Sequence, residues 1–234
     1  MEVQRLDKFI SSQLVSASRK DAREMIKRGE VSVNGAVERS AERKIDAERD
    51  SVTLRGEPVG FKKHLYIMLN KPAGVVCATR DGLSETVLEL LPPELRRTGL
   101  FPAGRLDKDT VGFVLITDDG ALAHRILSPK SHVDKEYFVR LRDDIPADAE
   151  EVFAGGMELD GEKCLPAVLE KVSPKECRLT LREGKYHQIK RMFESLGNEV
   201  VYLKRISIAG IELDEKLSEG QARELTAEEL AKLF

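Results

Sequence analysis

The sequence has 234 residues, of which 41% are hydrophobic and 34% charged, with a formal net charge of −3 at pH 7. This hydrophobic fraction can build a core and excludes a disordered chain, and the length fits one large domain or a small and a larger one. Three widely spaced cysteines argue against a disulfide framework and for a reducing compartment. Because we find neither a secretory signal nor an apolar run of roughly 18 residues, we expect a soluble cytoplasmic protein with no membrane partner.

The N-terminal region predicts two helices followed by a hairpin and a further strand. Apolar side chains at helical spacing within residues 6–14 indicate the first helix. Ser18 is a typical cap for the second helix, and Gly29 marks its end. The Asn-Gly pair at 34–35 lies between two β-prone runs, which is a strong hairpin signal, and a strand follows at 50–56.

The composition changes after this unit of residues 1–54. Residues 55–63 are rich in Gly, Pro and Lys and are predicted to be a linker to a domain at 64–234. In that domain we predict strands at 65–79 (two runs), 111–117, 135–142, 164–172, 176–183 and 199–213. Helices are predicted at 84–91, 118–128, 146–156, 185–197 and 226–234. Because strict βαβ alternation is missing, we expect an α+β fold with a mixed, mainly antiparallel sheet and flanking helices.

A cluster of cations distinguishes the N-terminal region from the rest of the chain. The first 28 residues carry seven Lys or Arg against four acids. On the second predicted helix, cations recur four residues apart, and like charges so placed destabilise a helix unless an anion lies against them. A solvated helix face is the alternative. We favour RNA phosphate binding by the cations of this region, which are Arg5, Lys8, Arg19, Lys20, Arg23, Lys27 and Arg28.

The stretch GRLDKDTVG at 104–112 places charged side chains directly before an apolar strand. Asp107 could cap a turn, form an ion pair or act as a catalytic carboxylate, and Asp109 could equally be a turn residue. Spacing alone leaves these roles open. A buried, ionised Asp107 would need a cation, and the cluster around Lys190 and Arg191 in EGKYHQIKRMF could supply one.

Motifs for a metal or a nucleotide cofactor are missing from the sequence. The four histidines and three cysteines lack the usual ligand spacings, and neither a Walker-type nor a dinucleotide-binding glycine motif occurs. We therefore expect no metal site and no cofactor.

Four stretches together resemble the pseudouridine synthases that modify ribosomal RNA. GRLDKDTVGFVLITDDGALAHRILSP resembles their catalytic motif, LNKPAGVVCAT the first strand, and REGKYHQIKRMFESLGNEVVYLKRISIAGIEL the closing motif. RLDKFISSQLVSASRKDAREMIKRGEVSVNG resembles the S4-type RNA-binding domain. These matches span nearly the whole chain in the expected order. GKYHQIKRM resembles the RsuA-type branch, whose members act on small-subunit ribosomal RNA.

The resemblance implies roles for individual residues. Asp107 matches the catalytic aspartate. Tyr137, which by residue type alone fits half-buried structure or a base-stacking surface, matches the tyrosine that packs against the target base. Lys190 stands where many relatives have an arginine that pairs with the aspartate, and because lysine does not replace arginine in bidentate pairing, Arg191 is the alternative partner. The implied substrate-binding residues are Arg105, Thr110, Leu181, His187 and Arg191.

The resemblance also implies the reaction. The bond between uracil and ribose breaks, the base turns, and carbon 5 is joined to the sugar, without metal, redox cofactor or ATP. Asp107 would serve as nucleophile or proton acceptor, and the sequence leaves open whether it attacks the ring or the sugar. We expect a monomeric enzyme acting on one uridine of small-subunit ribosomal RNA, in a precursor or assembly intermediate. A large-subunit synthase and a non-catalytic ribosome-assembly factor are the alternatives.

Overall fold

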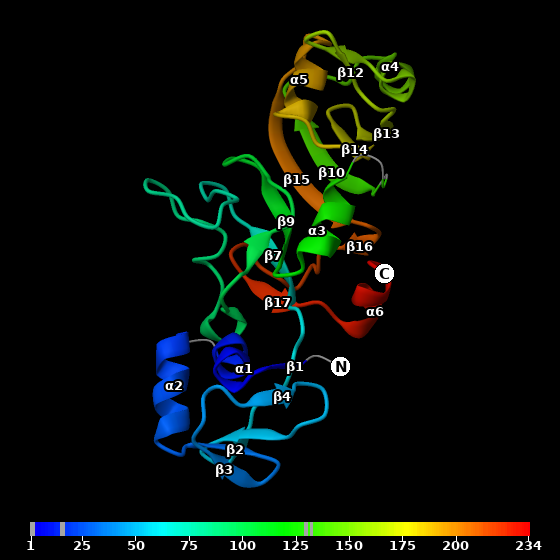
Figure 1. Cartoon of the computed structure of the whole chain (residues 1–234). Coiled ribbons are helices and arrows are strands. Elements are labelled where there is room, and N and C mark those ends of the chain that lie inside the picture. Colours follow the sequence, from blue (N-terminus) through cyan, green and yellow to red (C-terminus); the bar gives the residue numbers. More distant parts are fainter. Residues whose placement is uncertain (1–2, 15–16, 129–130, 132) are drawn as a thin grey trace. The chain divides into compact units, whose positions relative to one another are not determined.

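The structure is a computed structural model that describes residues 3–14, 17–128, 131 and 133–234. The chain forms two compact units (Figure 1). The first unit comprises Met1–Leu65 and Pro92–Leu100, and the second comprises Tyr66–Leu91 and Phe101–Phe234. None of the helices in the described residues is long and apolar enough to cross a membrane.

The first unit contains the two predicted helices and small antiparallel sheets. The helices are α1 (Leu6–Gln13) and α2 (Arg19–Lys27), and Pro93–Leu95 forms one 3₁₀ turn. The strands are β1 (Val3–Arg5), β2 (Val31–Val33), β3 (Ala36–Glu38), β4 (Lys44–Asp46), β5 (Val52–Leu54) and β6 (Glu57–Pro58). The described residues give one sheet in the order β3-β2-β5-β6 and a second that pairs β1 with β4.

Two local predictions in this unit are confirmed. The Ser18 hydroxyl accepts the Asp21 N–H while the Asp21 carboxylate accepts the Ser18 N–H, which satisfies free donors at the start of α2. Asn34 and Gly35 both have positive φ, 52° and 81°, and form the tight turn between β2 and β3.

The predicted linker at 55–63 needs correction. β6 lies within this range and pairs with β5, and the Phe61 ring stacks on Phe9 of α1 at 6.1 Å between ring centroids. Residues 92–100 also join this unit: the Arg97 guanidinium donates to the carbonyls of Lys62 and Lys63, both within the 55–63 range. The Gly, Pro and Lys composition concealed apolar side chains that bury against the first core.

The second unit is built on one large sheet, which confirms the predicted mixed, mainly antiparallel topology. Its strands are β7 (Tyr66–Lys71), β8 (Phe101–Pro102), β9 (Val111–Thr117), β10 (Lys135–Leu141), β11 (Glu158–Leu159), β12 (Glu162–Lys163), β13 (Val168–Ser173), β14 (Glu176–Leu181), β15 (Val200–Ile208), β16 (Ile211–Glu212) and β17 (Ala222–Glu224). The sheet runs β13-β14-β10-β15-β9-β7-β17, with β16 paired to β15, β8 to β9, and β11 and β12 as a separate hairpin. Among these pairs in the described residues, β15 with β9 is parallel and the others are antiparallel.

Helices pack against this sheet in separate places (Figure 1). They are α3 (Gly120–Leu127), α4 (Ala149–Gly155), α5 (Gln188–Glu194) and α6 (Ala227–Ala231). At one end α4 and α5 meet through the buried rings of Phe153 and Phe193, whose centroids are 5.1 Å apart. α3 packs on Phe113 and Leu115 of β9, an inner strand of the sheet, in a core that also contains Met68 of β7.

Gly112 fixes the parallel approach of β9 to β15. Its φ is +99°, and a Cβ at this position would lie 2.3 Å from the backbone oxygen of Arg205. Any other residue would push the two strands apart. The glycine that ends GRLDKDTVG therefore lets this loop lead directly into the centre of the sheet.

The helix predicted at 84–91 is wrong. Thr86 is buried, and its N–H and hydroxyl both donate to the Glu89 carboxylate within a series of turns. Pro92 has no N–H and ends the segment before a full helix can form. The second run of the preceding predicted strand is reduced to a single bridge between Val76 and Thr86.

Candidate active site

The loop between β8 and β9 carries Asp107, and a buried lysine binds the backbone of this loop. Lys71, at the end of β7, has a fully buried side chain. Its Nζ donates to the carbonyls of Pro72, Lys108 and Thr110 at 3.1, 3.2 and 2.7 Å. Burial lowers the pKa of Lys71 from its ordinary value. Because two of these carbonyls lie in the loop that carries Asp107, Lys71 holds the backbone of that loop in place.

Two carboxylates of the loop share one ammonium group. Lys190 of α5 places its Nζ 3.1 Å from Oδ2 of Asp107 and 2.6 Å from Oδ1 of Asp109. The hydrogen bond from Lys190 holds the pKa of Asp109 below its usual value. Burial acts to lower the pKa of Lys190, but its hydrogen bonds to Asp109 and Asp107 outweigh burial and leave that pKa raised. The Asp107 side chain is 27% exposed and Asp109 is 72% exposed.

His187 is a second contact of Asp107. Its Nε2 lies 3.5 Å from Oδ1 of Asp107. His187 caps the N-terminus of α5 in the left-handed region, with φ 47° and ψ 32°. Arg191, the alternative partner considered from the sequence, instead pairs with Asp160 and donates to the Tyr186 carbonyl. The structure thus brings Lys190 and His187 to Asp107 and directs Arg191 elsewhere.

These side chains border an open cavity of about 420 Å³. The residues that line it are Ala73, Gly74, Asp107, Lys108, Asp109, His187 and Lys190. The cavity offers a partly exposed carboxylate, a cation that neutralises it and an imidazole beside it. This set can carry nucleophilic or proton-transfer chemistry at a carboxylate. Among the described residues, no cluster of three or more His, Cys, Asp or Glu could hold a metal ion.

The other predicted substrate-binding residues do not line this cavity. Tyr137 of β10 is 8% exposed and Leu181 of β14 is 2% exposed. Thr110 is also buried; its N–H closes the turn onto the Asp107 carbonyl, and its hydroxyl finds no hydrogen-bond partner in the described residues. Arg105 is exposed to solvent.

The predicted RNA-binding arginines of the first unit surround an internal acid. Asp7 is fully buried and accepts hydrogen bonds from Arg5, Arg19 and Arg23 at 2.9–3.3 Å. Burial acts to raise the pKa of Asp7, but the three guanidinium groups outweigh burial and hold that pKa well below its usual value. Asp7 is therefore an anion that balances the closely spaced arginines of α2, a role that the sequence argument had given to RNA.

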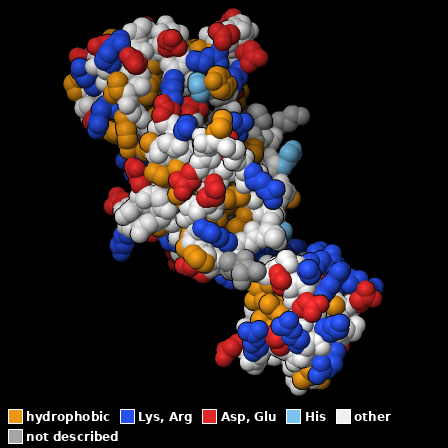
Figure 2. All heavy atoms as spheres, turned by 90° about the vertical axis from the view of Figure 1, so that its left-hand side faces the viewer, with side chains coloured by type: hydrophobic (Ala, Val, Ile, Leu, Met, Phe, Trp, Pro, Cys, Tyr) orange, Lys and Arg blue, Asp and Glu red, His pale blue; other side chains and the backbone are white. Residues whose placement is uncertain are grey.

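The remaining cations of that set face solvent. Figure 2 shows Lys and Arg side chains gathered on the first unit. Lys8, Lys20 and Lys27 are exposed, and no ion pair to a described residue is formed by them. Arg28 is exposed and lies 3.9 Å from Glu30. These side chains are available to an external anion.

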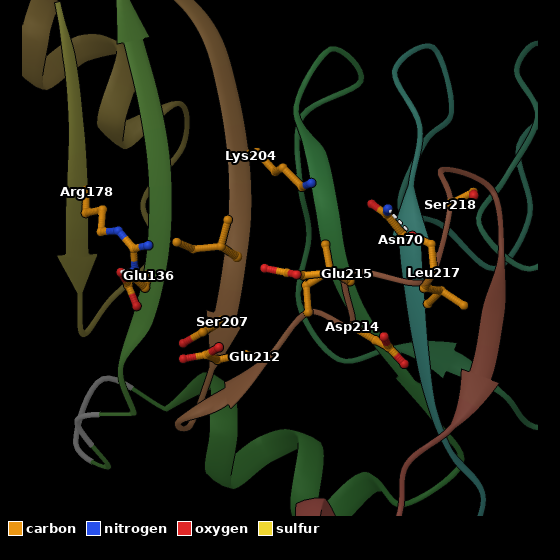
Figure 3. Close-up of a pocket in the computed structure, with 12 residues that line it drawn as sticks. Asn70, Glu136, Arg178, Lys204, Ser207, Glu212, Asp214, Glu215, Leu217 and Ser218 are labelled. Carbon is orange, nitrogen blue, oxygen red and sulfur yellow. Dashed lines mark hydrogen bonds and ion pairs between the residues drawn. The ribbon is translucent and has the colours of Figure 1, made fainter. Parts of the chain in front are cut away.

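A second cavity, of about 360 Å³, lies on the opposite face of the large sheet (Figure 3). Glu136 and Lys204 line it, and they alternate along their strands with Tyr137 and Arg205, so they project to the other side. In Figure 3 Lys204 points from β15 toward β9, and Arg178 pairs with Glu136 at 3.0 Å. Four carboxylates and two cations line this cavity, so it carries an excess of negative charge that disfavours an anionic ligand. We therefore place the candidate active site at Asp107.

Sequence reasoning missed Lys71 and Asp7, which organise the two charged clusters. Both are charged residues with fully buried side chains, and residue type alone predicts exposure for each. A usable signal for Lys71 was its position at the end of an apolar strand inside LNKPAGVVCAT. Tyr186, next to His187, was also not assigned a role, and its side chain is 76% exposed.

Comparison with known families agrees with the two-unit structure. Residues 65–195 match the family described as RNA pseudouridylate synthase. Residues 4–50 match the S4 domain. The first match spans more than half of the chain and contains Asp107, Lys190 and His187.

Individual relatives align over nearly the whole chain. Ribosomal small subunit pseudouridine synthase A of Escherichia coli (strain K12) is 48% identical over 231 residues, 97% of this chain and 98% of that protein. An uncharacterised RNA pseudouridine synthase of Bacillus subtilis (strain 168) is 45% identical over 231 residues, 97% of this chain and 96% of that protein. A solved crystal structure of pseudouridylate synthase aligns at a TM-score of 0.70 and 42% identity, covering 98% of this chain and 99% of that one.

Proposed function

The chain belongs to the RNA pseudouridylate synthase family, and we propose that it converts one uridine of small-subunit ribosomal RNA to pseudouridine with Asp107 as the reacting carboxylate. The observation that carries this assignment is the placement of Asp107 in a cavity, 3.1 Å from the Lys190 ammonium and 3.5 Å from the His187 ring. The small-subunit substrate is supported by the relative from Escherichia coli, whose name states it.

The geometry suits an aspartate that must react as a carboxylate. Lys190 supplies the opposite charge that an ionised Asp107 needs, and Lys71 holds the loop so that the carboxylate does not turn away. One Asp107 oxygen faces Lys190 and the other faces His187, and the side chain keeps 27% exposure. The target base must leave its stack to reach this cavity, which costs a few kcal/mol.

The predicted site residues that do not line the cavity have supporting roles in this proposal. Tyr137 and Leu181 project from the same face of the β10–β14 pair, because Leu181 is paired with Lys135 and side chains alternate along β10. Because both are largely buried, we assign these two side chains to the packing that supports the cavity from within the sheet. Arg105, exposed two residues before Asp107, and Arg191 are assigned to contacts with the RNA backbone.

The first unit is assigned to phosphate binding. Its exposed cations are Lys8, Lys20, Lys27 and Arg28, together with the half-exposed arginines around Asp7. Phosphate contacts release counterions, so RNA affinity should fall steeply with salt. Replacing Lys20 with Met should lower the slope of log affinity against log salt by about one unit. A slope that stays unchanged for each of the four exposed cations would remove this assignment.

The remaining parts of the proposal concern the cellular setting. We propose that the chain acts as a monomer in the cytoplasm, on a precursor or assembly intermediate of the small subunit. Cys77, Cys164 and Cys177 are all free and buried, which suits a reducing compartment. Burial raises the pKa of Cys177 to about 12, so this thiol stays protonated and unreactive.

The test is release of label from uracil carbon 5. Unmodified transcripts of small-subunit and large-subunit ribosomal RNA, tritiated at that carbon, are incubated separately with the full-length chain. We expect release from one uridine of the small-subunit transcript. Asp107→Asn should lower the rate at least about 100-fold while RNA affinity stays nearly unchanged, because a carboxylate that takes part in proton transfer or attack is lost.

Three outcomes would contradict the proposal in different ways. Equal, negligible release by the original chain and by Asp107→Asn, with intact RNA binding, would indicate a non-catalytic assembly factor. Release from the large-subunit transcript would make the substrate assignment wrong while the chemistry stands. Full activity of Asp107→Asn would remove the carboxylate from the reaction.

A further inference from the structure

Tyr186 forms the outer layer of a ring stack that begins at the Asp107 carboxylate. Its ring lies on the His187 ring, with centroids 3.8 Å apart and planes inclined by 19°. His187 in turn places Nε2 3.5 Å from Asp107. The Tyr186 side chain is 76% exposed, so one face of its ring covers His187 and the other face is open to solvent.

The turn that carries Tyr186 is held rigidly. The side chain of Gln188 is buried; its Oε1 accepts the Lys185 N–H at 2.9 Å and its Nε2 donates to Glu183 at 2.7 Å. Arg191 donates to the Tyr186 carbonyl at 3.2 Å. These bonds over-determine the backbone, which explains how His187 keeps a left-handed conformation that costs a non-glycine residue of order 1–3 kcal/mol. The exposed ring is therefore presented in a fixed place.

The Tyr186 ring differs from the tyrosines of the sheet in having little contact with the rest of the protein. Tyr137, by contrast, is 8% exposed, and the Tyr202 ring packs against Phe138 and Arg140. Among the described residues the Tyr186 hydroxyl forms no hydrogen bond, and its ring contacts His187 alone of the aromatic side chains. A rigid, exposed aromatic ring beside cationic groups is typical of surfaces on which single-stranded RNA stacks its bases.

We propose that the open face of Tyr186 stacks on the nucleobase next to the target uridine. The inference rests on the proposed function, because it places that uridine at Asp107. When the uridine leaves its stack, the neighbouring base loses a partner on one side, and a fixed aromatic ring can replace it. Tyr186 is then a substrate-positioning residue: it holds the strand beside the cavity while Asp107 reacts.

The first experiment measures stacking without turnover. The probe is a single-stranded oligouridine with one central 2-aminopurine, whose fluorescence is quenched when the base stacks. We expect quenching on binding to the original chain and to Tyr186→Phe, and loss of quenching with Tyr186→Ala. Affinity of the alanine variant should fall about 5- to 150-fold, which corresponds to the ~1–3 kcal/mol per base lost when a stacking aromatic is replaced by alanine.

The second experiment measures turnover on tritiated small-subunit ribosomal RNA. We expect kcat/KM to fall within the same range for Tyr186→Ala and to be restored by Tyr186→Phe. Tyr202→Ala is the matched control. The Tyr202 ring projects from the face of β15 that carries Lys204 and the second cavity, so this variant should leave both quenching and turnover unchanged.

The outcomes separate this inference from the proposed function. Quenching and turnover unaffected by Tyr186→Ala would overturn the inference. Lost turnover with unchanged quenching would also overturn it, because Tyr186 would then act only through His187. Quenching that depends on Tyr186 in a chain that releases no tritium would uphold stacking on RNA and make the proposed reaction wrong.

Discussion

Each of the two units contains an aspartate that pairs with cations, and the ratio of cations to carboxylates differs between the two clusters. In the first unit Asp7 is fully buried and faces three arginines. In the second unit Asp107 is 27% exposed and shares the single ammonium of Lys190 with Asp109. One cluster has an excess of positive charge and the other an excess of negative charge.

The difference separates a structural acid from a reactive one. Three guanidinium groups donate to the buried carboxylate of Asp7, so its charge is neutralised inside the unit and the surplus positive charge is left for an external anion such as phosphate. Asp107 has one cation at one oxygen and an imidazole near the other, with a cavity beside it. A carboxylate that is only partly neutralised and still accessible can react.

The largest effect in this comparison is expected at Lys190. Lys190→Met removes the only ammonium within 4 Å of Asp107 among the described residues. We expect kcat/KM on tritiated small-subunit RNA to fall about 100- to 1,000-fold, the usual result of removing one charged stabilising group from an active site. Lys190→Arg, which preserves the charge, should retain most of the activity.

Lys185→Met is the matched control for Lys190→Met. Lys185 lies in the same segment, but its Nζ pairs with Glu162 and not with Asp107. If both lysine variants lose activity equally, the contact between Lys190 and Asp107 is not what the reaction depends on.

The second effect is on folding of the first unit. Asp7→Asn keeps the shape of the side chain but leaves three arginines without their shared anion. We expect a loss of about 3 kcal/mol in the free energy of unfolding of this unit, the low end for breaking a buried ion pair, because the arginines are half exposed and screened by water. This loss is measured by urea unfolding of the full-length chain, with hydrogen exchange of the amides in α1 and α2 as the signal for the first unit.

Glu42→Gln provides the control for the Asp7 cluster. Glu42 also contacts Arg5, at 3.2 Å, but its side chain is 77% exposed. A surface pair of this kind contributes between zero and about 1 kcal/mol. If both variants lower the free energy of unfolding equally, the burial of Asp7 does not determine how much its ion pairs contribute to stability.

The charged clusters show which parts of the site the sequence could predict. Asp107 and Lys190 were found because they lie in motifs that can be compared with a family. Lys71 and Asp7 were not, because their function depends on burial, and a charged side chain gives no local signal of burial. Which of Lys190 and Arg191 faces Asp107 depends on how α5 is rotated, and spacing does not reveal it.

The fold could be predicted where a segment carries its own signal. The Ser18 cap and the Asn34-Gly35 turn are decided within a few residues, and both are confirmed. The two-residue strands β6 and β8 have no periodicity and form only because a longer strand lies beside them. The apolar spacing in 84–91 predicts a helix, but the segment forms turns, because Pro92 directly after it cannot continue a helix.

The third prediction concerns pH and the first unit. Because the pKa of Asp7 is lowered in the folded state, its contribution to stability is fully present above its ordinary value of 3.8 and is lost as the pH falls through the lowered value. The difference in unfolding free energy between the original chain and Asp7→Asn should therefore be constant near neutral pH and shrink below pH 3.8. A difference that grows on acidification would contradict the assigned direction.

The smallest effect is expected at Asp109, and it tests how the two carboxylates divide their shared cation. Asp109 forms the shorter contact with Lys190, 2.6 Å against 3.1 Å for Asp107, yet it is 72% exposed. Asp109→Asn leaves Lys190 to Asp107 alone, and the loss of an exposed pair is worth about 1 kcal/mol at most, so kcat/KM should change less than about 5-fold. Because Asp107→Asn alters the same cluster by the same chemical change, the two variants differ only in which carboxylate is lost. If Asp109→Asn lowered turnover as far as Asp107→Asn, the pair would act as one unit, and Asp107 would not be the sole reacting group.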